Sequence, residues 1–203
     1  MNADDKALLA TFGIGLIAGG SYFGYSYLFG PKDDESFASL LGESVLTLTG
    51  STNKTEWEAR LKELQAKKSE LSGTLISIAD QNWDDLQTWC RQNSNKNLKK
   101  DVNYVGFEEF CTWKIGDKEW VGKISSDTQV ADDKWSNAHR ELNRRDRRRL
   151  SPELQKIQVV DIKKKPDNKA MHDWCTGTYK KIWRGESSRD YADVQEFCKS
   201  TAK

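Results

Sequence analysis

LQTWC at residues 86–90 and MHDWC at residues 171–175 are two copies of one pattern, and they belong to an internal duplication. Two further pairs flank this one: WEARLKEL (57–64) with WSNAHREL (135–142), and YVGFEEFC (104–111) with YADVQEFC (191–198). The offsets between the copies are 78, 85 and 87 residues, and they drift only where loops would take insertions. Three collinear matches, two of which place a cysteine after an aromatic residue, indicate a duplicated structural unit.

Each matched segment has the spacing of an amphipathic helix. Trp57, Leu61 and Leu64 share one face of the first segment, and aromatic residues recur at three-residue intervals from Tyr104 in the third. The residues predicted to cap these helices are Thr55, Asp80 and Asp133. We therefore expect a mainly α fold with two similar three-helix repeats, at residues 53–114 and 133–203. The two copies could also pack as one six-helix body.

The segments that flank the repeats differ from them in composition. Residues 31–52 are predicted to form a stalk, and residues 115–132, which are rich in Gly, Ser and Asp, are predicted to form a linker. Hydrophobic residues alternate with polar ones in ESVLTL (43–48), and EWVGKI (119–124) is similar. Each of these two short runs could form a strand.

The N-terminal segment has the length and composition of a membrane anchor. Residues 8–30 include no charged residue over 23 positions, and about 20 apolar residues suffice for a helix to cross a bilayer. The leader MNADDK is acidic, and no small-residue cleavage site follows the apolar run. We predict a single uncleaved transmembrane helix within residues 1–30 that contacts the lipid bilayer through residues 8–30. A cleaved signal peptide and a buried hairpin are the alternatives.

The four cysteines fall at equivalent places in the two copies, at positions 90, 111, 175 and 198. Four cysteines allow three pairings, and the duplication selects the one in which each copy closes on itself. The prediction is therefore Cys90 with Cys111 and Cys175 with Cys198, a pattern typical of an oxidising, outward-facing location. Four buried free thiols and a zinc site remain alternatives, although no C-x-x-C motif is present.

Little in the chain could support catalysis. The sequence contains no nucleophile elbow, P-loop or dinucleotide fingerprint. Of the two histidines, His139 stands on an apolar helix face and is predicted to be packed and hydrogen-bonded, whereas His172 is predicted to be exposed. We expect a non-enzymatic protein without catalytic residues, metal or cofactor. Three prolines and a hydrophobic content of 36% also exclude a proline-rich linker protein, a collagen and a multi-spanning membrane protein.

Charge is divided unequally between the two halves of the chain. Residues 31–134 contain 14 basic and 19 acidic side chains, for a net charge of −5, whereas residues 135–203 contain 17 basic and 10 acidic ones, for a net charge of +7. The candidate polyanion-binding residues in the basic half are Arg144, Arg145, Arg147, Arg148, Arg149, Lys163, Lys164 and Lys165. The simpler interpretation is a solvated helix end, and the functional one is a patch that binds anionic glycans, anionic lipid or nucleic acid.

Taken together, these parts resemble the uncharacterised paralogous surface proteins of haemotropic mycoplasmas. The residues that carry the resemblance are the glycine-bearing apolar N-terminus, the Lys/Asp-rich stalk, the Trp–Leu helix, and the Trp89-Cys90 and Trp174-Cys175 pairs, each followed by a later Phe-Cys. The resemblance implies a wall-less cell with the domain exposed on its single membrane. It also implies antigens or host-cell contacts without an established activity, and it supplies no functional residues.

The sequence thus predicts a membrane-anchored protein with an extracellular domain that acts as a non-catalytic interaction protein or variable antigen. Its partner would lie on a host cell or another surface, and polyanionic glycans are candidate ligands for the basic patch. The alternative is an intracellular, membrane-tethered binder of nucleic acid or anionic lipid that uses residues 144–149. Paired cysteines favour the first interpretation, and a nucleic-acid partner is therefore not expected.

Overall fold

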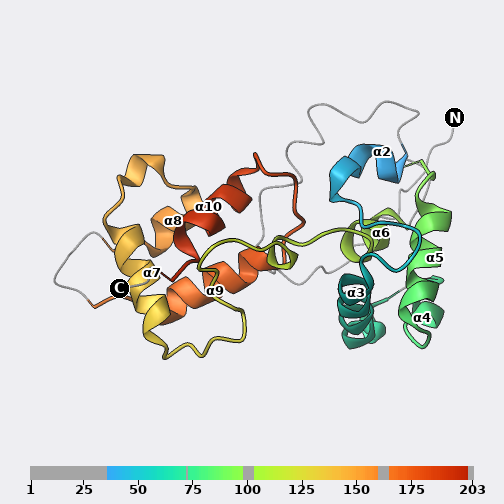
Figure 1. The fold of residues 1–203 in the computed structure, drawn as a ribbon, viewed down its shortest axis with the longest axis horizontal. Coiled ribbons are helices and arrows are strands. Elements are labelled where there is room, and N and C mark those ends of the chain that lie inside the picture. Colours follow the sequence, from blue (N-terminus) through green and yellow to red (C-terminus); the bar gives the residue numbers. More distant parts are fainter. Residues whose placement is uncertain (1–35, 72, 98–102, 160–164, 201–203) are drawn as a thin grey trace, which may run out of the picture. The chain divides into compact units, whose positions relative to one another are not determined.

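The computed structural model describes residues 36–71, 73–97, 103–159 and 165–200, all within one compact unit, Asp33–Lys203. This part of the chain is mainly helical, as predicted (Figure 1). The α-helices are α2 (Phe37–Leu41), α3 (Lys54–Ala66), α4 (Leu75–Ile78), α5 (Trp83–Asn93), α6 (Tyr104–Phe110), α7 (Asp133–Asn143), α8 (Pro152–Ile157), α9 (Asn168–Tyr179) and α10 (Arg189–Phe197). Four 3₁₀ turns accompany them: η1 (Gly42–Ser44), η2 (Lys68–Glu70), η3 (Ile115–Asp117) and η4 (Arg147–Arg149).

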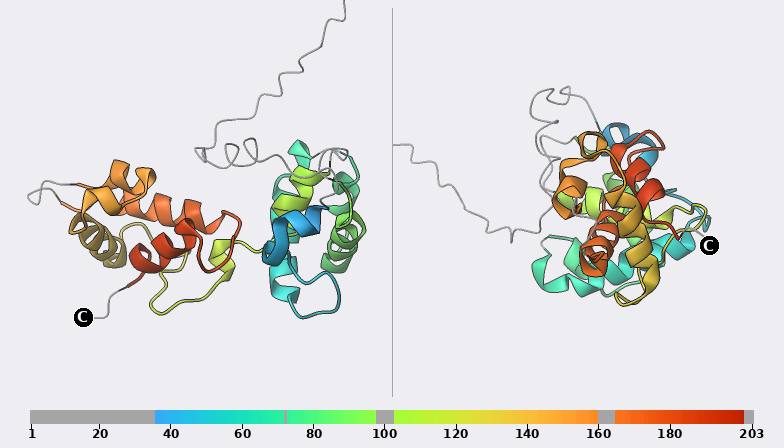
Figure 2. Two further views of the ribbon diagram at one scale, coloured as in Figure 1. Left: turned by 90° about the horizontal axis from the view of Figure 1, so that it is seen from above. Right: turned by 90° about the vertical axis from the view of Figure 1, so that its left-hand side faces the viewer.

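The helices form two separate hydrophobic cores, one for each copy of the duplicated pattern. In the first copy α3 packs on α5 and α6, around the fully buried Trp57. In the second copy α7 packs on α9 and α10, around the fully buried Trp135. Figure 2 shows the corresponding elements from two further directions. Trp113, between the copies, packs partly against both cores.

Pairs of isolated antiparallel β-bridges extend the correspondence beyond the helices. Ser36 pairs with Asn97 in the first copy, and Lys114 pairs with Ile182 in the second. The second pair of equivalent bridges joins Val45 to Thr112 and Lys123 to Lys199. The residues in these bridges are offset by 78, 85 or 87 positions, which are the offsets of the matched sequence segments.

The segments predicted as stalk and linker therefore belong, where the structure describes them, to the folded copies. Phe37, Leu41 and Leu46 of the predicted stalk are buried in the first core. Ile115 and Ile124 of the predicted linker are buried in the second. Three short helices alone leave apolar surface exposed to solvent, and these flanking residues cover that surface.

The two predicted strands form single bridges instead. The backbone nitrogen of Leu46 donates to the carbonyl of Cys111 at 2.9 Å, and that of Ile124 donates to the carbonyl of Cys198 at 3.0 Å. Each extended segment thus pairs only with the few residues that follow the second cysteine of its copy.

Three of the helices begin near, but not at, the predicted caps. Asn82, rather than Asp80, caps α5, and its side chain accepts hydrogen bonds from the backbone nitrogens of residues 84 and 85. Asp132, rather than Asp133, caps α7. Thr55 lies inside α3, whose N-cap residue is Asn53.

Both predicted disulfides are confirmed. Cys90 is bonded to Cys111, with Cα atoms 5.7 Å apart, and Cys175 is bonded to Cys198, with Cα atoms 5.8 Å apart. All four cysteines are fully buried. Each bond connects the second and third of the matched helical segments of one copy, so the cores are cross-linked independently of each other.

The predicted membrane anchor, residues 8–30, lies outside the described residues. Among the helices that the structure does describe, none has the length and apolar character needed to span a bilayer.

Candidate functional site

The arginine-rich segment 144–149 leaves the end of α7, passes through η4 and leads into α8. All five of its arginines are exposed, whereas Leu150, which follows, is buried in the second core. Asp146 caps η4 by accepting a hydrogen bond from the backbone nitrogen of Arg148 at 3.0 Å. The buried Leu150 and the Asp146 cap therefore fix the position of this turn, while its cationic side chains face solvent.

Three of the five arginines are paired with carboxylates. The ion pairs are Arg144 with Glu141 at 2.5 Å, Arg145 with Glu196 at 2.9 Å and Arg148 with Asp146 at 2.8 Å. Hydrogen bonds from Arg148 hold the pKa of the Asp146 carboxyl below its usual range. Within the described part of the chain, the side chains of Arg147 and Arg149 form no ion pair with a carboxylate, although Arg149 interacts with Asp146 at longer range. These two arginines therefore supply most of the uncompensated charge.

A groove of about 480 Å³ adjoins this segment, on the side of α10. Its walls carry both signs of charge. Among them, Arg189 donates a hydrogen bond to the buried Asp193 at 2.9 Å. Burial also raises the pKa of the Asp193 carboxyl. Arg144, Arg145 and Arg149 of the segment also line this groove, where the four arginines outnumber the three acidic residues by one. Of the predicted lysines, Lys165 is exposed, and Lys163 and Lys164 lie outside the described residues.

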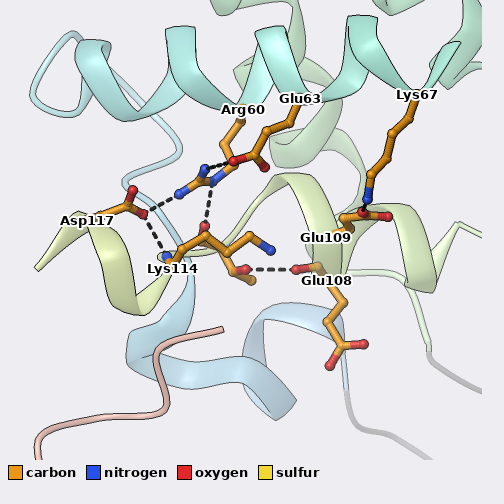
Figure 3. Close-up of polar contacts among 8 residues, drawn as sticks. Arg60, Glu63, Lys67, Glu108, Glu109, Lys114 and Asp117 are labelled. Carbon is orange, nitrogen blue, oxygen red and sulfur yellow. Dashed lines mark hydrogen bonds and ion pairs between the residues drawn. The ribbon is translucent and has the colours of Figure 1, made fainter. Parts of the chain in front are cut away.

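A second cluster of charges, which the sequence did not reveal, surrounds Arg60 (Figure 3). Arg60 is only 1% exposed, and its Nε donates to the carbonyl of Thr112 at 3.2 Å. Its guanidinium also binds Glu63 at 2.8 Å and the carboxylate of Asp117. Asp117 in turn accepts a hydrogen bond from the backbone nitrogen of Lys114 at 2.7 Å. Arg60 therefore ties α3 of the first copy to η3, at the start of the second.

Lys114 completes this cluster and lines a neighbouring cavity of about 690 Å³. The residue is 7% exposed, and among the described residues its amine has no hydrogen-bond or ion-pair partner. Burial, followed by the nearby Arg60 charge, lowers the pKa of Lys114 to about 8. A buried amine of this kind is a candidate for chemistry because perturbed pKa values concentrate at functional sites.

Lys118 and two tryptophans make a further contact between the copies. The Nζ atom of Lys118 lies 3.6 Å from the centroid of the Trp113 ring and 4.0 Å from that of Trp183. The two indole faces attract the cation, since the aromatic quadrupole is negative above the ring. This stack has the features of a structural contact rather than a binding site, because protein side chains already occupy both faces of the cation.

The two histidines differ in their surroundings, and His172 lines the same cavity as Lys114. His139 is fully buried, as predicted, with Nε2 2.8 Å from the carbonyl of Ile157 and Nδ1 accepting from the backbone nitrogen of Asp167 at 2.9 Å. His172, predicted to be exposed, is half-buried with its ring edge against Trp135. Its Nδ1 contacts Asp173 at 2.9 Å.

Comparisons of the chain with protein-family models, with curated proteins and with solved structures gave no match.

Proposed function

We propose that this protein is a membrane-anchored, surface-exposed, non-catalytic interaction protein that binds polyanions through the arginine-rich segment 144–149. The observation that carries the proposal is the exposed η4 turn, where Arg147 and Arg149 form no ion pair with a carboxylate among the described residues. Arginine is suited to sulfate and phosphate recognition because its planar guanidinium can donate two parallel hydrogen bonds.

Two further observations support an outward-facing domain and a surface ligand. The buried disulfides, one in each copy, are typical of an oxidising compartment. The resemblance to surface proteins of wall-less bacteria agrees with that location. In such a location the polyanions within reach are sulfated and sialylated glycans of a host cell.

Heparin chromatography of the full-length protein in detergent tests the proposal. We expect elution well above physiological salt, about 0.15 M, because several arginines would release counterions together. Arg147→Ser with Arg149→Ser should move elution to clearly lower salt. The matched control, Arg144→Ser with Arg148→Ser, removes the same charge from arginines that are already paired. It should have a smaller effect.

Elution at or below physiological salt, or equal effects of the two double variants, would contradict the proposal. An oligonucleotide and vesicles containing phosphatidylserine serve as competing ligands. Either ligand could displace the protein from heparin at a lower concentration than sulfated glycans do. That result would favour the alternative, an intracellular binder of nucleic acid or anionic lipid.

A further inference from the structure

The side chain of Lys114 is unusual because it is both buried and unpartnered. Arg60 and Lys123, which line the same cavity, have their charged groups satisfied by carboxylate and carbonyl oxygens. The Lys114 amine has neither kind of partner among the described residues, although the residue is only 7% exposed. Burying an ammonium without hydrogen-bond acceptors costs far more free energy than burying a neutral amine in the same place.

The surrounding charges come from three elements. Arg60 and Glu63 lie on α3, Glu109 lies on α6, and Asp117 lies on η3; all four interact electrostatically with Lys114. In Figure 3 no interaction is drawn to the Lys114 amine. Lys67 binds Glu109, and Arg60 binds both Glu63 and Asp117. The three carboxylates near Lys114 are therefore engaged with other cations.

We propose that Lys114 is a reactive amine that captures small aldehydes entering the adjacent cavity, by forming an imine. In this step the neutral nitrogen attacks the carbonyl carbon and a C–N bond forms. The carbon–oxygen bond then breaks, and the oxygen leaves as water with the two protons of the amine. The step needs no oxidant or reductant, and hydrolysis reverses it.

The cavity can hold a polar aldehyde of modest size. Its volume is about 690 Å³, and its wall includes the hydroxyl-bearing residues Ser125, Ser126 and Thr176 as well as Lys180. An aldehyde with an anionic group could reach Lys180, which forms no ion pair with the described residues. Because burial lowers the pKa of Lys114 to about 8, its neutral fraction at pH 7 is about two hundred times that of an ordinary lysine.

The experiment uses pyridoxal 5′-phosphate as the probe, with the full-length folded protein. Short incubation at pH 7, reduction with borohydride and peptide mapping give the labelling rate of each lysine. We expect Lys114 to react about tenfold faster than the exposed Lys62, since limited access offsets part of its advantage in neutral amine. The rate at Lys114 should level off above about pH 8, whereas the rate at Lys62 should continue to rise. In guanidinium chloride the preference should disappear.

A pair of matched variants sharpens the test. Glu109→Gln removes a carboxylate that favours the charged amine, so labelling of Lys114 at pH 7 should accelerate. Glu58→Gln makes the same change on the exposed face of α3, where Glu58 pairs with Lys54, and should leave the rate unchanged. The proposal would be overturned if Lys114 is labelled no faster than Lys62 in the folded protein, or if Glu109→Gln slows its reaction.

Discussion

Replacing Arg60 with methionine should lower the free energy of unfolding by about 3 kcal/mol, since breaking a buried ion pair leaves its partner charge uncompensated. Methionine fills much of the same space, so the loss is chiefly electrostatic. The change would leave the Asp117 side chain, which is 15% exposed, without its guanidinium partner. It would also deprive the Thr112 carbonyl of the donor at 3.2 Å. Urea denaturation measures the change.

The control is Lys62→Met, on the same helix but on its exposed side, which should change stability by less than about 0.5 kcal/mol. A double variant, Arg60→Met with Asp117→Asn, should recover part of the loss because it removes the carboxylate that was left unpaired. If Arg60→Met is no more destabilising than Lys62→Met, the buried cluster does not hold the two copies together.

Removing either disulfide should also have a large effect. Cys175→Ala with Cys198→Ala opens a loop with a sequence separation of 23 residues, and loops of this size contribute about 3 kcal/mol. Cys90→Ala with Cys111→Ala, with a separation of 21 residues, should cost a similar amount. Denaturation under non-reducing conditions measures both losses.

The region that loses stability can be predicted as well, because each disulfide lies in its own hydrophobic core. Hydrogen exchange should accelerate mainly in α9 and α10 when the second bridge is removed, and mainly in α5 and α6 when the first is removed. Equal acceleration in both copies with either variant would mean that the cores do not behave as separate units.

The duplication explains why much of this fold could be predicted from the sequence. Aromatic residues at helical spacing located the cysteine-bearing helices, and their equivalence selected the disulfide pairing. The flanking segments were harder because their apolar residues are sparse: Phe37 and Ile115 hold equivalent buried positions but differ in side chain. The alternation in residues 43–48 and 119–124 predicted strands, but each run forms only a single bridge.

The Arg60 cluster shows what the sequence pattern concealed. Trp57, Leu61 and Leu64 were predicted to face the core, yet Arg60 is buried and Leu61 only partly so. A guanidinium can occupy a buried position only when oxygen acceptors surround it, and two of its acceptors lie 52 and 57 residues away. Ala138 holds the equivalent position in the second copy, so the duplication gave no indication either.

Differential alkylation on intact cells, followed by peptide mapping, tests most directly the claim that this is an outward-facing protein with one disulfide in each copy. Because all four cysteines are buried and bonded, we expect none to be alkylated on intact cells, nor after denaturation without a reductant. Peptides mapped before reduction should join Cys90 to Cys111 and Cys175 to Cys198. Free thiols that react only after the cells are opened would contradict the account and would place the domain inside the cell.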